Sequence, residues 1–135
     1  ILPGVDSLNG KYQEMAKKLG LENKIKFLGY RTDIDKLMKI SDLAVSTSRQ
    51  EGLPVNILEA MMVGLPIIAT NCRGNRDLVN KTINIDDVVT LKKQIIYHIE
   101  NRGIPKYEIK KFLLETIMGK MIKIYIKINE EESNE

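Results

Sequence analysis

The apolar residues of the chain fall into two kinds of stretch, which alternate along the sequence. Short apolar runs are typical of strands, and the continuous run at residues 65–70 is typical of a strand covered on both faces. Longer stretches with an apolar residue at every third or fourth position are typical of helices that bury one face. We predict strands at residues 1–2, 24–28, 42–47, 65–70 and 82–85, the last at a sheet edge. This alternation predicts an α/β fold with a parallel sheet flanked by helices.

Breaker and capping residues separate the helical stretches. We predict helices over residues 10–19, 34–40, 54–63, 88–101 and 107–128. Thr32 and Asp33 are expected to cap the second of these helices, and Asp86 and Asp87 the fourth, because short polar side chains accept hydrogen bonds from the first amides of a helix. The acidic tail at residues 129–135 is expected to fray.

Two glutamates flank the start of the predicted helix at residues 54–63. Pro54 suits the first helical position, where its missing N–H would be unpaired, and Gly64 suits the end of the helix. Glu51 then precedes the helix and Glu59 lies within it. The free amides of a helix start favour an anion, whereas carboxylates accept hydrogen bonds from hydroxyls. The arrangement suits a ligand with a central phosphate and hydroxyls at both ends, such as a nucleotide sugar.

A simpler interpretation of the glutamate pair also stands. Acidic residues are common near helix starts because they interact favourably with the helix dipole, so the pair could be solvated and without function. The predicted sheet favours a site, since the loops at residues 29–32, 46–53 and 71–76 all follow carboxyl ends of strands. Open parallel sheets bind their ligands at that edge.

Composition narrows the class of partner. The net charge is only +3, and the chain has no Trp, 5 Tyr and 2 Phe, which argues against a nucleic-acid platform of stacking aromatic residues. The single Cys72 excludes an internal disulfide and fits a reducing cytoplasm, where we expect it to be an inert thiol. No apolar run approaches the length of a membrane span and no secretory signal is visible, although the mild basic charge would suit peripheral contact with an inner membrane face. His98 stands alone, and we expect no metal site.

Residues 45–70, VSTSRQEGLPVNILEAMMVGLPIIAT, resemble the donor-binding signature of retaining glycosyltransferases with the GT-B fold. The large group 1 family, which includes many capsule and exopolysaccharide transferases, is the most similar. Residues 25–33, IKFLGYRTD, and 73–79, RGNRDLV, resemble the motifs before and after that signature. The resemblance implies a Rossmann-like sheet and a sugar transfer, with retained configuration, from a nucleoside-diphosphate sugar to an acceptor hydroxyl.

The resemblance also implies roles for individual residues. Glu51 would lie beside the donor sugar and its leaving phosphate as the catalytic residue, and Glu59 would accept hydrogen bonds from the ribose hydroxyls. The remaining donor-binding residues would be Gly52 and Leu53, through backbone amides, Leu58 against the nucleoside, and Tyr30 and Arg31 beside the base. No cofactor or metal is needed where preorganised donors stabilise the leaving diphosphate. UDP is preferred over GDP as the nucleotide.

The chain departs from the family pattern in extent. By the resemblance, we expect it to match the donor-binding half of such an enzyme without the first strand and helix of that half and without the N-terminal domain. We expect a partial donor-binding domain at residues 1–106, a terminal helix at 107–128 that crosses toward the absent N-terminal domain, and the acidic tail. The missing strand belongs between the strands at residues 1–2 and 42–47.

The expected function is therefore that of a glycosyltransferase fragment in the synthesis of a cell-surface polysaccharide or glycolipid. Its partners would be a nucleotide sugar, an acceptor sugar or lipid-linked saccharide, and the N-terminal domain, but no nucleic acid. The isolated chain is expected to bind nucleotide weakly and to transfer no sugar. The alternatives are a catalytically inactive nucleotide-sugar-binding module, a sugar-nucleotide epimerase, and a remnant that binds a partner through its last helix. A dehydrogenase is disfavoured because no Gly-x-Gly-x-x-Gly follows a strand.

Overall fold

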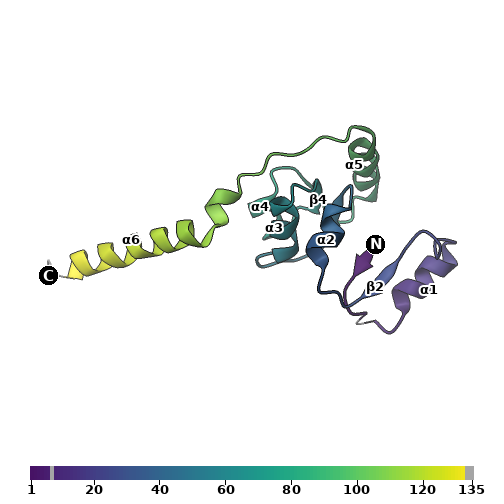
Figure 1. Cartoon of the computed structure of the whole chain (residues 1–135), viewed down its shortest axis with the longest axis horizontal. Coiled ribbons are helices and arrows are strands. Elements are labelled where there is room, and N and C mark those ends of the chain that lie inside the picture. The colour runs from purple at the N-terminus through teal and green to yellow at the C-terminus, as the bar shows by residue number, and fades with distance from the viewer. Residues whose placement is uncertain (7, 133–135) are drawn as a thin grey trace. The chain divides into compact units, whose positions relative to one another are not determined.

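The computed structural model describes residues 1–6 and 8–132, in which short parallel strands alternate with helices (Figure 1). The chain divides into two compact units, Ile1–Ile40 and Ser41–Glu135. The parallel strands and flanking helices confirm the predicted α/β class. Among the described residues, no helix combines the length and the apolar character needed to span a membrane.

The first unit contains a two-stranded parallel sheet and two short helices. Strand β1 (Leu2–Pro3) pairs with β2 (Phe27–Gly29), with Leu2 opposite Phe27. The helices are α1 (Lys11–Lys18) and α2 (Ile34–Lys39). Within the described part of this unit, Ala16 is the one fully buried apolar residue.

Two predictions for the first unit were wrong in detail. The strand predicted at residues 24–28 begins only at Phe27, because the amides of Lys24 and Ile25 donate to the carbonyl of Leu21 in a turn, at 2.9 and 3.0 Å. Asp33 occupies the cap position of α2 but its side chain does not cap the helix. Its carboxylate binds the guanidinium of Arg31 instead, so neither Asp33 nor Thr32 is a side-chain cap.

The second unit is built on a three-stranded parallel sheet. Strand β4 (Ile67–Thr70) lies between β3 (Ala44–Ser46) and β5 (Thr82–Ile83), with Ile68 opposite Val45 and Thr70 opposite Ile83. All four residues of β4 are buried, which confirms the prediction of a strand covered on both faces. In the described residues β5 pairs with β4 alone and is the predicted edge strand.

Each sheet lies within one unit. Among the described residues, β1 is paired only with β2, and β3 only with β4. The strand expected between β1 and β3 stays a prediction.

Helix α3 (Val55–Met62) connects β3 to β4 and buries one face. Ile57, Ala60 and Met61 are its buried residues, at the spacing that places them on one side of a helix. Its end has the predicted glycine: Gly64 has a left-handed φ of 74°, and the amide of Leu65 donates to the carbonyl of Ala60 at 2.9 Å. Pro54 is the capping residue with an extended backbone rather than the first helical residue, so the helix begins one position later than predicted.

Two helices follow β4. Helix α4 (Asn75–Leu78) is a single turn, and α5 (Val88–Glu100) is capped by Asp87, whose carboxylate accepts from the amide of Thr90 at 2.9 Å. This hydrogen bond lowers the pKa of Asp87. Asp86 does not share the capping role, because its carboxylate forms an ion pair with Arg49 at 2.6 Å.

The last helix begins later than predicted. The structure has a 3₁₀ turn, η1 (Ile109–Phe112), followed by α6 (Leu114–Glu132), in place of one helix from residue 107. The extended backbone at Leu113 separates them. Tyr107 precedes both, and its hydroxyl donates to the carbonyl of Leu65 at 3.0 Å. Residues 129–132 of the predicted frayed tail are helical, and residues 133–135 lie outside the described residues.

Candidate functional site

The loops that follow β3 and β4 contact each other at the carboxyl edge of the sheet. The hydroxyl of Thr70, at the end of β4, donates to the carbonyl of Ser48 in the loop after β3. A Cβ atom placed on Gly74 would lie 2.5 Å from the carbonyl oxygen of Gly52 and 3.1 Å from the Cβ of Glu51. Gly74 also has a φ of 87°, so both space and backbone conformation require glycine there. These contacts confirm the prediction that the loops at 46–53 and 71–76 share one edge.

Glu51 is held by this loop. The hydroxyl of Ser48 donates to Oε1 of Glu51 at 2.6 Å, and the Glu51 side chain is half-buried. A carboxylate fixed through one oxygen by a neutral donor keeps acceptor capacity for a ligand hydroxyl. Ser48 therefore holds the Glu51 carboxylate through one oxygen, and the catalytic role of Glu51 stays a prediction.

The start of α3 presents unpaired amides beside Glu51. The amides of Ile57 and Leu58 both donate to the carbonyl of Pro54, at 3.1 and 3.3 Å. No side chain in the described part of the chain caps this start. The amides of Val55 and Asn56, which precede that first hydrogen bond, are thus left for solvent or for an anionic ligand.

The other predicted residues of this unit lie around the same helix start. Gly52 and Leu53 are exposed in the loop before α3. Val55, the first residue of α3, is also exposed, and so is Glu59 one turn further along the helix. Leu58 is half-buried on α3. Five predicted residues thus lie on the segment at residues 51–59, where Glu51 is half-buried and Glu59 is exposed: Glu51, Gly52, Leu53, Leu58 and Glu59.

Tyr30 and Arg31 belong to the first unit and follow β2. The Tyr30 side chain is exposed. The guanidinium of Arg31 donates two hydrogen bonds to the Asp33 carboxylate, at 2.8 and 2.5 Å. These hydrogen bonds lower the pKa of Asp33 and raise that of Arg31. The Arg31 side chain is therefore engaged by Asp33, and the predicted place of Arg31 beside the base stays a prediction.

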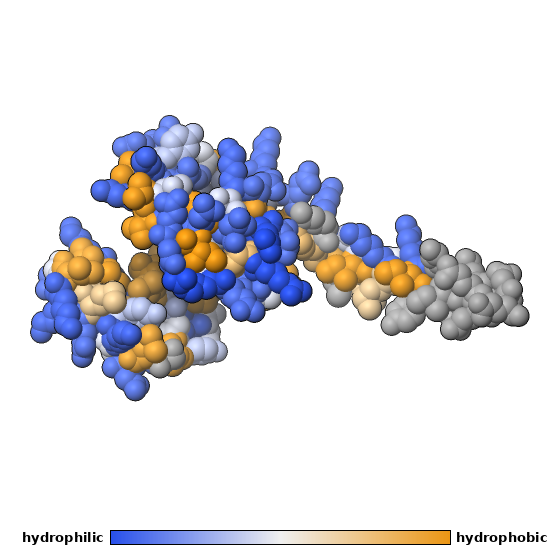
Figure 2. All heavy atoms as spheres, turned by 180° about the vertical axis from the view of Figure 1, so that it is seen from behind, coloured by the Kyte–Doolittle hydropathy of each residue, from blue (hydrophilic) through white to orange (hydrophobic). Residues whose placement is uncertain are grey.

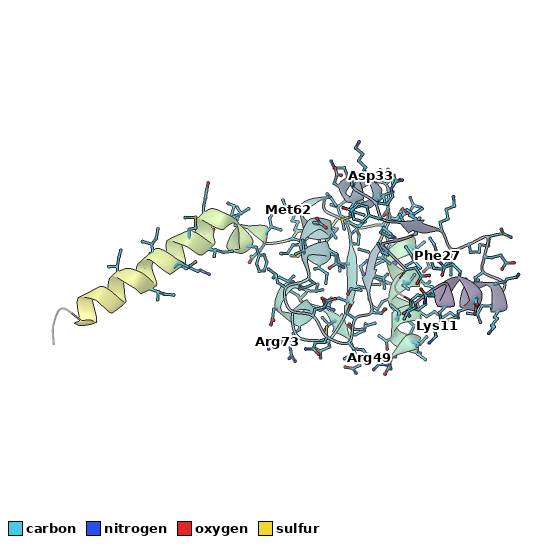
Figure 3. All side chains as sticks on the ribbon, turned by 90° about the horizontal axis from the view of Figure 1, so that it is seen from below. Lys11, Phe27, Asp33, Arg49, Met62 and Arg73 are labelled. Atoms are coloured by element: carbon cyan, nitrogen blue, oxygen red, sulfur yellow. The ribbon has the colours of Figure 1, made fainter. Side chains whose placement is uncertain are left out.

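Cationic side chains accompany both loops of the second unit. Arg49 and Arg73, labelled in Figure 3, follow β3 and β4 respectively, and both are exposed. Arg49 is paired with Asp86, whereas Arg73 is the neighbour of Gly74 and so lies next to the contact with Gly52. Arg73 entered the sequence analysis only as part of a motif, and its position makes it a candidate partner for an anionic group.

Asn75 and Thr70 form hydrogen bonds at these loops, and the sequence analysis gave neither of them a role. Asn75 was predicted in the loop at residues 71–76, but it starts α4 and is fully buried. Its amide nitrogen donates to the carbonyl and to the hydroxyl oxygen of Thr70, at 3.2 and 3.3 Å, which makes the burial tolerable. A polar residue directly after a glycine that follows a buried strand was the signal available in the sequence.

Neither Cys72 nor His98 was predicted as a site residue. Cys72 is a buried thiol without a disulfide, and its Sγ lies 4.0 Å from the hydroxyl oxygen of Thr70. Its inert role stays a prediction. His98 is half-buried with its ring against the edge of Tyr97, and it lines a separate hollow of about 600 Å³ between α5, β5 and residues 103–108. None of the predicted site residues lines that hollow. Among residues 1–6 and 8–132, no group of three or more His, Cys, Asp or Glu side chains could hold a metal.

Comparison with known proteins identifies the family of this chain. The family model described as glycosyl transferases group 1 matches residues 4–111. The putative glycosyltransferase EpsD of Bacillus subtilis is 33% identical over 105 residues, which are 73% of this chain and 28% of that protein. The chain thus spans less than a third of the length of that relative.

Solved structures give the same fold. Anabaena Alr3699/HepE in complex with UDP-glucose matches with a TM-score of 0.66 and 32% identity, over 74% of this chain and 30% of that one. TarM matches with a TM-score of 0.81 and 23% identity over 91% of this chain and 28% of that one, which shows the fold alone. The predicted Rossmann-like α/β fold is confirmed, and the chain belongs to the group 1 glycosyltransferase family.

Proposed function

We propose that this chain is the donor-binding part of a retaining glycosyltransferase. The enzyme would transfer a sugar from a nucleoside-diphosphate sugar, with UDP as the nucleotide, to an acceptor hydroxyl. The acceptor would be a sugar or lipid-linked saccharide in the synthesis of a cell-surface polysaccharide or glycolipid. Membership of the group 1 family and the likeness to a structure bound to UDP-glucose support this proposal.

One observation carries the proposal: a held carboxylate and an uncapped helix start lie on one exposed segment. The Glu51 carboxylate accepts a hydrogen bond from the Ser48 hydroxyl, and four residues later α3 begins with no side-chain cap among the described residues. A diphosphate at the amides of Val55 and Asn56 would place a sugar toward Glu51 on one side. The exposed Glu59, one turn further along α3, would accept hydrogen bonds from ribose hydroxyls on the other.

The segment would act on the leaving group. Transfer breaks the bond between the sugar carbon and the diphosphate oxygen, so positive charge grows on the sugar and negative charge on the diphosphate. Amides fixed at the helix start favour the developing negative charge without reorganising, and the Glu51 carboxylate would face the cationic sugar. Arg73 would add a positive charge at the same edge. We expect no metal and no cofactor for this chemistry.

The rest of the enzyme would supply the acceptor side. The chain covers 28% of EpsD and 30% of Alr3699/HepE, which leaves room for a further domain in proteins of that size. Ile117, Met121 and Ile124 on α6 are 42–59% exposed, and apolar side chains are visible along that helix in Figure 2. We propose that this helix packs on the N-terminal domain. A cytoplasmic location, with peripheral contact at the inner membrane face, stays a prediction.

Nucleotide titration tests the donor site. We expect the isolated chain to bind UDP weakly, GDP more weakly still, and to transfer no sugar. Substituting Glu59→Gln should weaken UDP and UDP-glucose alike by about tenfold or more, the effect of losing a charged hydrogen bond. Substituting Glu51→Gln should weaken UDP-glucose more than UDP, because Glu51 lies toward the sugar. Chemical shifts of ¹⁵N-labelled chain would report both affinity and place.

The matched control is Glu100→Gln, an exposed glutamate at the end of α5. Equal affinities for the Glu59 and Glu100 variants, or ligand-induced shifts around the hollow beside His98 instead of residues 51–59, would contradict the proposal. In an enzyme that also contains the N-terminal domain, Glu51→Ala should abolish transfer and keep UDP binding. Unchanged turnover in that variant would favour a role for Glu51 in binding alone.

A further inference from the structure

A chain of hydrogen bonds leads from the buried end of β4 to Glu51. The amide nitrogen of Asn75 donates to the hydroxyl oxygen of Thr70 at 3.3 Å, and the hydroxyl of Thr70 donates to the carbonyl of Ser48. The hydroxyl of Ser48 in turn donates to the Glu51 carboxylate at 2.6 Å. Four residues from three separate segments are thus linked, and only the last of them was assigned a role by the resemblance.

The series of hydrogen bonds begins at buried residues and ends at half-buried ones. Asn75 is 0% exposed and Thr70 3%, whereas Ser48 and Glu51 are half-buried. The bonds therefore connect a fixed part of the core to a carboxylate that a ligand can reach. Thr70 accepts from Asn75, and its hydroxyl has two acceptors within reach, the Ser48 carbonyl oxygen and, at 4.0 Å, the Cys72 Sγ. The carbonyl oxygen is the closer and the stronger acceptor, so we assign the proton to it.

Gly74 packs closely against the backbone of the loop that contains Glu51. The space for a Cβ at Gly74 is already occupied by the Gly52 carbonyl oxygen, at 2.5 Å, and by Glu51 atoms at 3.1 Å. The Gly74 amide donates to the Asp77 carboxylate at 3.2 Å, which anchors the glycine to α4. The backbone at Glu51–Gly52 is thus bounded by Gly74, while the Glu51 side chain is held by Ser48.

Burial alone does not explain these polar residues. Valine has nearly the shape of threonine and suits a buried strand at least as well, so packing does not call for a hydroxyl at position 70. Oδ1 of Asn75 is buried without a hydrogen-bond partner among the described residues, which is unfavourable. The unpaired Oδ1 of Asn75 is explained if the role of its Nδ2 is to orient the Thr70 hydroxyl, which in turn holds the loop at Ser48.

We propose that Thr70 and Asn75 are positioning residues that orient the Glu51 carboxylate, through Ser48, toward the donor sugar. This inference rests on the proposed function for the role of Glu51, whereas the orientation itself is a property of the chain. Thr70 and Asn75 touch neither sugar nor phosphate in this proposal. They act by keeping Glu51 in one side-chain conformation before the donor arrives.

The first test measures that conformation without any ligand. Scalar couplings and NOEs of the Glu51 methylene protons in the labelled chain should report one rotamer. Thr70→Val, which removes the hydroxyl at nearly constant shape, should cause rotamer averaging at Glu51, and Ser48→Ala should do the same. Thr70→Ser, which restores a hydroxyl, should restore the single rotamer. Thr82→Val makes the same exchange in the neighbouring strand β5 and should leave Glu51 unchanged.

The second test measures the consequence for the donor. Thr70→Val should weaken UDP-glucose by about fivefold, the effect of one lost hydrogen bond, while UDP alone binds as before. Thr70→Ser should recover the affinity, and Thr82→Val should show none of the loss. An Asn75→Ala variant that folds should resemble Thr70→Val. Amide chemical-shift dispersion would establish that each variant is folded.

The two tests separate this inference from the proposed function. If Glu51 averages its rotamers in the unsubstituted chain, or stays fixed in Thr70→Val, the positioning role is overturned. Should Glu51→Gln weaken UDP-glucose while Thr70→Val does not, the donor site stands and the positioning role falls. If Glu51 is oriented as described but Glu51→Gln has no effect on UDP-glucose, the proposed function of Glu51 fails instead.

Discussion

The two compact units share one pattern of alternating strands and helices but bury very different amounts of apolar surface. In the described part of the first unit, Ala16 is the single buried apolar residue, whereas the second unit buries apolar residues from α3, β4, α4 and β5. Leu2 of β1 is 51% exposed and Ile68 of β4 is 3% exposed, although both lie in parallel strands. Strand and helix order therefore does not by itself fix where the stability of this chain resides.

The position of a strand in its sheet explains the contrast. Strand β4 has a partner on each side, and α3 contributes a three-residue apolar face to the same core. The sheet of the first unit has only β1 and β2 among the described residues, and two paired strands are marginally stable in water. Burial of apolar area is the main favourable term in folding, so the second unit should hold most of the stability.

Two matched substitutions to alanine, one in each unit, test whether the second unit holds most of the stability. We expect Ile68→Ala to lower the free energy of unfolding by about 2–5 kcal/mol, because it leaves a cavity in the buried strand. Leu2→Ala, at the half-exposed position in β1, should cost less than about 1 kcal/mol. Urea unfolding followed by circular dichroism measures both. Equal losses for the two variants would show that the first unit is packed as tightly as the second.

A substitution at Tyr107 would show whether the segment before η1 contributes to the stability of the second unit. Its hydrogen bond to Leu65, 42 residues earlier, ties the segment before η1 to the start of β4. Tyr107→Phe should lower the free energy of unfolding by about 1 kcal/mol, the loss of one hydrogen bond with little change in shape. An unchanged unfolding midpoint would mean that the segment contributes nothing to the core.

This tyrosine also predicts a pH dependence. Burial raises the pKa of Tyr107, so its protonated form is favoured by folding. The contribution is complete below the pKa of an unfolded tyrosine, about 10, and is lost as the pH rises through the higher folded pKa. The difference in stability between the unsubstituted chain and Tyr107→Phe should therefore shrink at strongly alkaline pH. A difference that grows there would contradict the assigned hydrogen bond.

The smallest expected effects come from one carboxylate in each unit. Asp6 accepts from the amides of Leu8 and Gly10, and Asp87 accepts from the amide of Thr90; these hydrogen bonds lower the pKa of both groups. Their contribution to stability is present above the ordinary aspartate pKa of about 4 and is lost as the pH falls through the lower folded pKa. Asp87→Ala should lower the thermal midpoint at neutral pH, with the difference fading in acid.

Asp6→Ala serves as the counterpart in the first unit. We expect faster amide hydrogen exchange at Leu8 and Gly10 with almost no change in the thermal midpoint, since the first unit contributes little to global unfolding. A midpoint shift as large as that of Asp87→Ala would contradict the unequal division of stability.

Much of the fold could be read from local chemistry. Gly64 was expected to end α3 because glycine adopts the left-handed conformation at low cost, and the structure has it there with the expected hydrogen bonds. The buried strand β4 followed from its continuous apolar run. Where two polar groups competed for a partner, prediction was wrong: Asp33 binds Arg31 instead of capping α2, and Asp86 binds Arg49 and leaves the capping to Asp87.

The sequence by itself determined the α/β class, the edge at which the loops gather, and the segment from Glu51 to Glu59, because apolar periodicity, glycines and prolines act over a few residues. Only the tertiary structure decided what holds that segment. The Thr70 hydroxyl meets Ser48 across 22 residues of sequence, and Gly74 closes on Gly52 after a helix and a strand have intervened. Such contacts depend on how β3 and β4 pair, and pairing between separate strands has no signature in either strand alone.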